Sequence, residues 1–245
     1  MIKNIRSMSH DEVMKLSLLG LDDSFSFRCK SCGKCCKQRK DILLTPYDVY
    51  RLARYLCRTP EEIIKSYCET YEGHSSHLPI VRIIPQPPEN SCPFLRNRKC
   101  VVHAAKPVLC RVFPLARINR GKETAEYYYG DGPSCGHEIG TTTVRDWIAD
   151  VASDESERAG TVWATTLRRI VPALHDEYEK KKPDDYTQII NAVFTMMYLP
   201  YDTAQDFAVQ CQKNTETLCE LLLKVFGIQT LTYEETQKII EENEK

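Results

Sequence analysis

Residues 29–36 read Cys-Lys-Ser-Cys-Gly-Lys-Cys-Cys, and this run decides how the N-terminal half of the chain folds. Two residues separate each of the first three cysteines, so a tight turn can aim successive sulfurs at one centre. Gly33 can adopt the unusual backbone angles that such a loop needs. A 4Fe–4S cluster takes three of its ligands from a Cys-x2-Cys-x2-Cys run, and the fourth from a distance. The run therefore predicts a metal centre that holds this half of the chain together.

Cys36 directly follows Cys35, and two adjacent cysteines do not easily bind the same metal centre. Side chains of neighbouring residues usually point apart, so we expect the two thiols to serve different centres, or one of them to be spare. Four more cysteines follow at wider spacing: Cys92, Cys100, Cys110 and Cys135. Cys92 precedes a proline, as the remote ligand of a ferredoxin loop does, and the paired Cys-x2-Cys of a zinc ribbon is missing. Eight thiols allow two four-sulfur sites, or one cluster and a smaller site.

The composition is that of an ordinary globular protein. The 245 residues are 42% hydrophobic and carry a net charge of −1, which suffices for one large domain or two small ones. No segment approaches the ~18 apolar residues of a membrane span, and Met1 to Lys15 lacks the apolar core of a secretory signal. We therefore expect a cytoplasmic protein with no membrane partner. The neutral overall charge also gives no case for a nucleic-acid partner.

Twelve cysteines in a reducing compartment argue for metal or redox chemistry rather than disulfides. Four of them, Cys57, Cys68, Cys211 and Cys219, lie on or beside apolar helical stripes, where buried cysteine packs as a small hydrophobe. His103 and His137 lie close to cysteines of the cluster and could replace a thiol, but eight thiols already suffice.

The N-terminal half is expected to contain short elements around the cysteines. Residues 9–19 predict a short helix with a capping box. Thr45-Pro46 and Thr59-Pro60 each predict the start of a helix, with threonine as N-cap and proline at the first helical position. Residues 79–84 predict a strand. Residues 112–118 and 124–129 predict a hairpin that brings Cys110 and Cys135 together at its open end.

From Thr141 the apolar residues recur at helical spacing to the end of the chain. Pro172 should kink or end its helix. The expected fold is mostly α with a small β-hairpin, in which an irregular cysteine-rich, metal-nucleated domain precedes a C-terminal helical bundle. The expected domains are an N-terminal helix (1–23), a metal domain (24–140) and a helical domain (141–245). In the metal domain, the metal is expected to substitute for a hydrophobic core.

Basic residues surround both cysteine groups. Metal-bound thiolates form a negative centre, and nearby cations offset that charge and raise the reduction potential. The alternatives are a solvated basic loop or a nucleic-acid patch, but no aromatic residues are interleaved as a nucleic-acid patch requires. The basic residues are Lys30, Lys34, Lys37, Arg39, Lys40, Arg96, Arg98, Lys99 and Arg111.

The cysteines belong to a longer ordered set of motifs: Cys29-x2-Cys32-Gly33-x-Cys35-Cys36, Ile42-Leu43-Leu44-Thr45, Asp48, Arg51-Leu52-Ala53, Cys92-Pro93-Phe94-Leu95, Cys100 and Pro107-x2-Cys110-Arg111-x-Phe113-Pro114. This set resembles the YkgJ-type cysteine-cluster family, described as zinc- or iron-chelating. The resemblance implies that the eight cysteines are the metal ligands. A related cysteine domain occurs in flagellin lysine-N-methylases, which favours an iron–sulfur cluster and raises methyl transfer as a possible activity.

Three function classes follow. The first is a metal-binding protein whose iron–sulfur cluster, preferably 4Fe–4S, has a structural, electron-transfer or redox-sensing role, with a protein partner bound by the helical half. The second is a zinc-stabilised interaction protein. The third is a protein-modifying enzyme, similar to a lysine methyltransferase, with the cluster as an accessory. The glycine-rich, Walker, nucleophile-elbow and zinc-protease motifs are all missing, so catalysis stays open.

Overall fold

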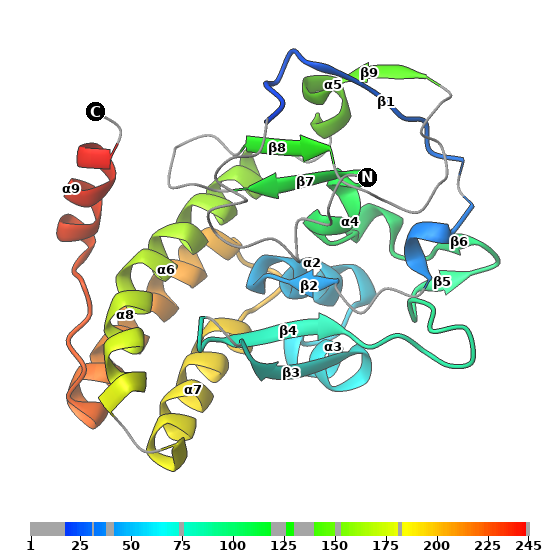
Figure 1. Cartoon of the computed structure of the whole chain (residues 1–245). Coiled ribbons are helices and arrows are strands. Elements are labelled where there is room, and N and C mark those ends of the chain that lie inside the picture. Colours follow the sequence, from blue (N-terminus) through cyan, green and yellow to red (C-terminus); the bar gives the residue numbers. More distant parts are fainter. Residues whose placement is uncertain are drawn as a thin grey trace. The chain divides into compact units, whose positions relative to one another are not determined.

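The structure is a computed structural model of the chain (Figure 1). It describes residues 18–30, 32–37, 42–73, 76–118, 126–129, 140–149, 153–180 and 183–243. The helix predicted at residues 9–19 lies almost wholly outside this part of the chain. At its end, Leu19 forms an isolated antiparallel bridge with Tyr127 instead of a helical turn.

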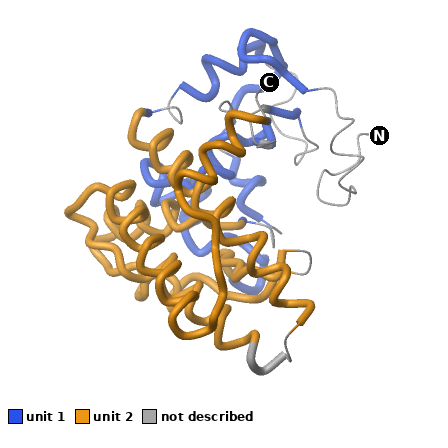
Figure 2. The backbone as a smooth tube through the Cα atoms, turned by 90° about the vertical axis from the view of Figure 1, so that its left-hand side faces the viewer, with its two compact units in different colours: residues 1–42, 85–153 blue, residues 43–84, 154–245 orange. Residues whose placement is uncertain are grey.

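The chain folds into two compact units that alternate along the sequence (Figure 2). Unit 1 comprises Met1–Ile42 and Pro85–Ser153, and unit 2 comprises Leu43–Ile84 and Asp154–Lys245. The predicted domains, by contrast, follow one another in sequence. Whether those predicted segments fold separately stays a prediction. All eight cysteines of the predicted centre belong to unit 1.

Unit 1 is built from short antiparallel strand pairs and short helical turns. Its hydrophobic cluster contains Phe25, Phe27, Val112, Leu115, Tyr127, Val144 and Ile148, all buried. Trp147 packs edge-on against Phe27, with ring centroids 5.2 Å apart, and donates its indole N–H to the Val112 carbonyl at 3.2 Å. The expectation that metal replaces a hydrophobic core is therefore wrong for this part of unit 1, because aromatic residues far apart in the sequence form one.

Two strand pairs contribute residues to this hydrophobic cluster. Strand β7 (Leu115–Ile118) pairs with β8 (Glu126–Tyr129), which confirms the predicted hairpin pairing. Its first strand begins later than predicted, because Val108–Val112 forms helix α4. Strand β1 (Ser24–Ser26) pairs with β9 (Thr141–Thr143), and α5 (Val144–Ile148) follows. This last pair was not predicted, and the helical region therefore starts at Val144 and not at Thr141.

Two capped helices open unit 2. Helix α2 (Pro46–Leu56) begins after Thr45 and α3 (Pro60–Tyr67) after Thr59, as predicted. At Thr59 the hydroxyl accepts from the Glu62 N–H at 3.2 Å, and the Glu62 carboxylate accepts from the Thr59 N–H at 2.8 Å. Each capping box satisfies donors that a helix start would otherwise leave unpaired.

A three-stranded antiparallel sheet follows α3, in the order β2-β4-β3. Its strands are β2 (Leu43–Leu44), β3 (Cys68–Glu72) and β4 (Pro79–Ile83). Strand β4 is the predicted strand. Cys68 was expected on an apolar helical stripe, but residues 68–72 form β3, on which Tyr71 is exposed. Alternation along the chain puts Val81, Ile83 and Cys68 on the buried face of this sheet.

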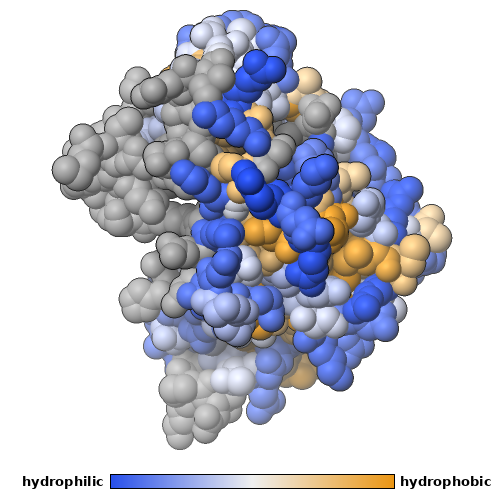
Figure 3. Space-filling model, turned by 90° about the vertical axis from the view of Figure 1, so that its right-hand side faces the viewer, coloured by the Kyte–Doolittle hydropathy of each residue, from blue (hydrophilic) through white to orange (hydrophobic). Residues whose placement is uncertain are grey.

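The rest of unit 2 consists of α6 (Asp154–Lys180), α7 (Pro183–Tyr198), α8 (Phe207–Phe226) and α9 (Tyr233–Asn243). The predicted stripes are buried at Ile170, Leu174, Ile189, Val193, Met197, Phe207, Cys211, Leu218 and Leu222. Val225 is the exception, at 62% exposed. Seen in space-filling form, one face of the molecule is largely hydrophilic, with hydrophobic residues gathered near its middle (Figure 3).

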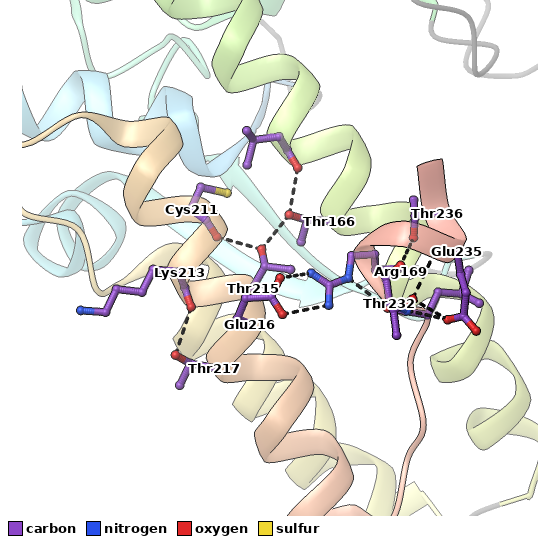
Figure 4. A network of polar contacts seen from close by, with 12 residues as sticks. Thr166, Arg169, Cys211, Lys213, Thr215, Glu216, Thr217, Thr232, Glu235 and Thr236 are labelled. Atoms are coloured by element: carbon purple, nitrogen blue, oxygen red, sulfur yellow. Dashed lines mark hydrogen bonds and ion pairs between the residues drawn. The ribbon is translucent and has the colours of Figure 1, made fainter. Parts of the chain in front are cut away.

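Helix α6 continues through Pro172 instead of ending there. Close to this proline, Arg169 forms hydrogen bonds with the segment that leads to α9 (Figure 4). Its Nε donates to the Leu231 carbonyl at 3.0 Å, while the Leu231 N–H donates to the Arg169 carbonyl at 3.2 Å. The guanidinium also forms a two-point ion pair with Glu216 on α8. A buried guanidinium needs such partners, and here they join α6, α8 and the segment before α9.

The fold class is confirmed: the protein is mostly α, with small sheets and a C-terminal helical region. Among the helices that the structure describes, none combines the length and the apolar character needed to cross a bilayer.

Replacing Thr59 with alanine removes one half of the α3 capping box. We expect the free energy of unfolding to fall by about 1 kcal/mol, because the Glu62 N–H loses its acceptor. Urea denaturation followed by circular dichroism measures this. The control is Thr217→Ala, since Thr217 is exposed within α8 and its hydroxyl donates to the Lys213 carbonyl of its own helix. Equal losses in the two variants would contradict the assignment of the cap.

Candidate metal centre

A backbone contact joins the two cysteine groups. The Cys92 N–H donates to the Cys36 carbonyl at 2.7 Å, and Lys37 forms an antiparallel bridge with Ser91. Lys37 also pairs with Glu89 through its ammonium group. These contacts bring the end of the Cys29–Cys36 run beside the start of the second group, although more than fifty residues separate them in the sequence.

The second cysteine group, from Cys92 onward, begins with a hairpin that was not predicted. Strand β5 (Leu95–Arg96) pairs with β6 (Lys99–Cys100) through a two-residue turn. Asn97 and Arg98 both have positive φ, 47° and 66°, as a type I′ turn requires. An asparagine at the first turn position was the available signal, but two-residue strands show no alternating pattern. The hairpin returns Cys100 toward the loop that contains Cys92.

Gly33 packs the first run against this hairpin. Its φ is 71°, in the left-handed region, and it precedes the 3-10 turn η2 (Lys34–Cys36). A β-carbon at this position would lie 3.2 Å from Leu95 Cδ1 and 3.6 Å from the Arg98 carbonyl oxygen. Glycine is therefore needed here for both its backbone angles and its lack of a side chain.

Cys110 comes from a third segment. It lies in α4, where its N–H donates to the Pro107 carbonyl at 2.9 Å, so the residue that was predicted to flank the hairpin is on a helical turn. Cys135, its predicted partner across the hairpin, lies outside the described residues. The expectation that the hairpin brings these two thiols together thus stays a prediction.

Five thiols gather at the junction of these segments: Cys35, Cys36, Cys92, Cys100 and Cys110. The Sγ atoms of Cys35 and Cys36 are 3.9 Å apart, so these two side chains do not point apart as expected. Cys36 also interacts electrostatically with Cys92 and Cys110, and Cys100 with Cys35 and Cys92. All five are half-buried.

The environment of Cys36, Cys92 and Cys100 raises the pKa of each thiol and so favours its protonated form. The hydrogen bond with Cys35, followed by burial, raises the pKa of Cys36 far above its ordinary value. Burial raises the pKa of Cys92 to about 11 and also raises the pKa of Cys100. A metal ion binds thiolates, so its binding must displace these protons.

Two cations lie within electrostatic reach of the thiols. Arg96 lowers the pKa of Cys92 and Lys106 lowers that of Cys100, each less strongly than burial raises it. Both cations would stabilise a metal-bound thiolate. This is the role predicted for the basic residues around the cysteines.

Two further predicted ligands, Cys29 and Cys32, belong to the described residues. Cys29 is exposed and Cys32 is half-buried. Within the described ranges, no three His, Cys, Asp or Glu side chains stand close enough together to hold an ion as they are. His103 is exposed in the 3-10 turn η3 (His103–Ala105), and His137 lies outside the described residues.

The other four cysteines lie in different settings. Cys68 and Cys211 are buried in unit 2, in agreement with a packing role. Cys219 is half-buried. Cys57 is exposed, with φ of 53°, and ends α2 as its C-cap. Packing does not explain Cys57, because its side chain has little around it.

Comparison with known proteins agrees with the cysteine cluster. Residues 28–135 match the CxxCxxCC family, whose description reads "Putative zinc- or iron-chelating domain". A Methanocaldococcus jannaschii protein, itself called uncharacterized, is 26% identical over 145 residues, covering 52% of this chain and 74% of that protein. No solved structure matches. The resemblance inferred from the motifs is thus confirmed over residues 28–135, which are similar to a zinc- or iron-chelating cysteine-cluster domain, while the relation to flagellin lysine-N-methylases stays a prediction.

Replacing Gly33 with alanine should disturb the junction. We expect a backbone cost of about 1–2 kcal/mol together with a clash against Leu95, so the variant should bind less metal. Gly227→Ala is a matched control: its φ is 70°, at the end of α8, and a β-carbon there meets nothing within 4 Å. Metal per chain, by elemental analysis, should fall only in Gly33→Ala. Full metal content in that variant would refute the role of Gly33.

Proposed function

We propose that the protein carries an iron–sulfur cluster, with a structural, electron-transfer or redox-sensing role. The observation that supports this most is the gathering of five thiols from three separate segments around the Cys-x2-Cys-x2-Cys run. Ligands from distant segments are what such a run needs to complete a cluster. The cations near Cys92 and Cys100 favour a negatively charged centre as well.

The ligands in this proposal are the eight cysteines of unit 1. Cys35, Cys36, Cys92, Cys100 and Cys110 form the inner set, and Cys29, Cys32 and Cys135 complete it. Bound iron and sulfide would supply one-electron chemistry. The protein's own residues hold the thiols, partly exclude water and offset negative charge. Binding of a protein partner through the helical half, and methyl transfer, stay predictions without a structural observation that favours either.

Zinc is the second candidate, and the distance between Cys35 and Cys36 favours it. Two thiolates on one zinc ion, at about 2.3 Å each in a tetrahedron, lie about 3.8 Å apart. The observed 3.9 Å fits two ligands of a single ion. Thiolates that bind different irons of a 4Fe–4S cluster lie farther apart, so in an iron–sulfur protein Cys35 and Cys36 would not both be corner ligands of one such cluster.

Anaerobic purification separates the two candidates. An iron–sulfur protein should be brown, with broad absorption near about 400 nm and with iron and acid-labile sulfide in equal amounts. A colourless protein with stoichiometric zinc would overturn the iron–sulfur proposal in favour of the zinc-stabilised interaction protein.

Single Cys→Ser substitutions test the inner set. Cys36→Ser and Cys92→Ser should each lose most of the bound metal, because each removes a thiolate at the point where the two cysteine groups meet. Cys57→Ser is the control, since Cys57 is an exposed cysteine of unit 2. Metal per chain and thermal melting are the measurements. If Cys57→Ser loses as much metal as Cys36→Ser, the inner set is wrongly assigned.

A further inference from the structure

The near-neutral net charge of the chain hides a strong separation of charge. Residues 28–42 and 85–118, which contain seven of the eight predicted ligands, have twelve Lys or Arg and two Asp or Glu, a net charge of +10. The remaining residues have 33 − 12 = 21 basic and 34 − 2 = 32 acidic residues, a net charge of −11. Two four-thiolate zinc centres would together carry only about −4, so the metal cannot account for all these cations.

Four of the cations form a compact surface next to the thiols, which we term the basic tip: Lys34, Arg96, Arg98 and Lys99. Arg96 and Lys99 face each other across β5 and β6, and Arg98 is in the turn between them. Lys34 is included because it directly follows Gly33, whose backbone lies close to the Arg98 carbonyl oxygen. All four are exposed, and none forms an ion pair with a carboxylate among the described residues.

The stability of the fold does not explain why these four cations lie together. Like charges directly opposite each other on paired strands are destabilising, so the Arg96–Lys99 pair weakens the hairpin. Arg96 is close enough to Cys92 to lower its pKa, which accounts for one cation of the four. The other three point to an anionic group that is supplied from outside.

The surroundings of the basic tip favour an acidic polypeptide over a nucleic acid. Val101, directly after β6, is 47% exposed and adds an apolar contact point beside the cations. An apolar centre with a charged rim is the usual composition of a protein interface. In the described part of unit 1 the exposed large hydrophobic residues are Leu21 and Val101, so no aromatic ring is available to stack on bases. Tight duplex binders also contact about 6–10 phosphates, more than this tip has cations.

We propose that the basic tip docks an acidic segment of a partner protein beside the cysteine centre. The inference rests on the proposed metal-binding function, because that function gives a partner reason to approach here. It differs from the expectation that a partner binds the helical half. Arginine can hold a carboxylate with two parallel hydrogen bonds, and opposite charges speed the encounter and set its orientation.

The test uses the purified, metal-containing full chain and a fluorescein-labelled peptide of alternating Glu and Gly, with binding followed by fluorescence anisotropy. The double variant Arg96→Glu/Arg98→Glu should weaken binding by about tenfold or more. Lys213→Glu/Lys238→Glu makes the same charge change on exposed residues of α8 and α9, and should alter binding by less than about twofold. Added salt should weaken the wild-type complex.

A short DNA duplex of equal total charge and vesicles containing phosphatidylserine are measured in parallel. Tighter binding of either one than of the peptide overturns the proposal, as does equal weakening in the two double variants or no binding at all. Arg96→Gln/Arg98→Gln replaces the glutamate variant if that variant fails to fold. Metal content is measured in every sample: wild-type protein that purifies anaerobically without metal but binds the peptide would refute the proposed function and leave the docking surface supported.

Discussion

The hydrogen bond between the Cys92 N–H and the Cys36 carbonyl is the contact on which the cysteine centre depends. Each cysteine group is local in sequence and too short to form a site alone. The bridge beside this bond, between Lys37 and Ser91, sets the register in which the groups meet. Gly33 then decides how closely the first run approaches the Leu95–Cys100 hairpin. The thiols are thus positioned mainly by backbone contacts, which are present without a metal.

The aromatic cluster of unit 1 limits how much stability a bound metal has to supply. Phe25, Phe27 and Trp147 pack together through the β1–β9 pair and α5, in a cluster whose described members include no cysteine. A metal bound by the cysteines therefore need not provide all of the stability of this half. Since buried thiols such as Cys92 are protonated in the free state, metal binding also changes the charge of the junction.

Local signals in the sequence were sufficient for part of this fold. The caps at Thr45 and Thr59 and the strand at Pro79–Ile83 follow from residues within one or two turns, and all were predicted correctly. The pairing of Ser24–Ser26 with Thr141–Thr143 could not be predicted, because it joins segments more than a hundred residues apart. Residues 68–72 form a strand because β4 offers an adjacent partner, which overrides their helical spacing. Similarly, the spacing of the cysteines indicated that they bind metal. Which of them lie together follows only from the Leu95–Cys100 hairpin and the Cys36–Cys92 contact.

The alternation of the two units gives this contact a further effect. The segment between Cys36 and Cys92 leaves unit 1, forms α2, α3 and the three-stranded sheet of unit 2, and returns. A metal that bridges these two cysteines closes residues 37–91 into a loop, as a cross-link would. Closure of a loop of this length lowers the entropy of the unfolded chain by an amount worth about 4 kcal/mol for a covalent cross-link. A metal that stays bound to both cysteines as the chain unfolds would thereby stabilise a segment of unit 2 through the unfolded state.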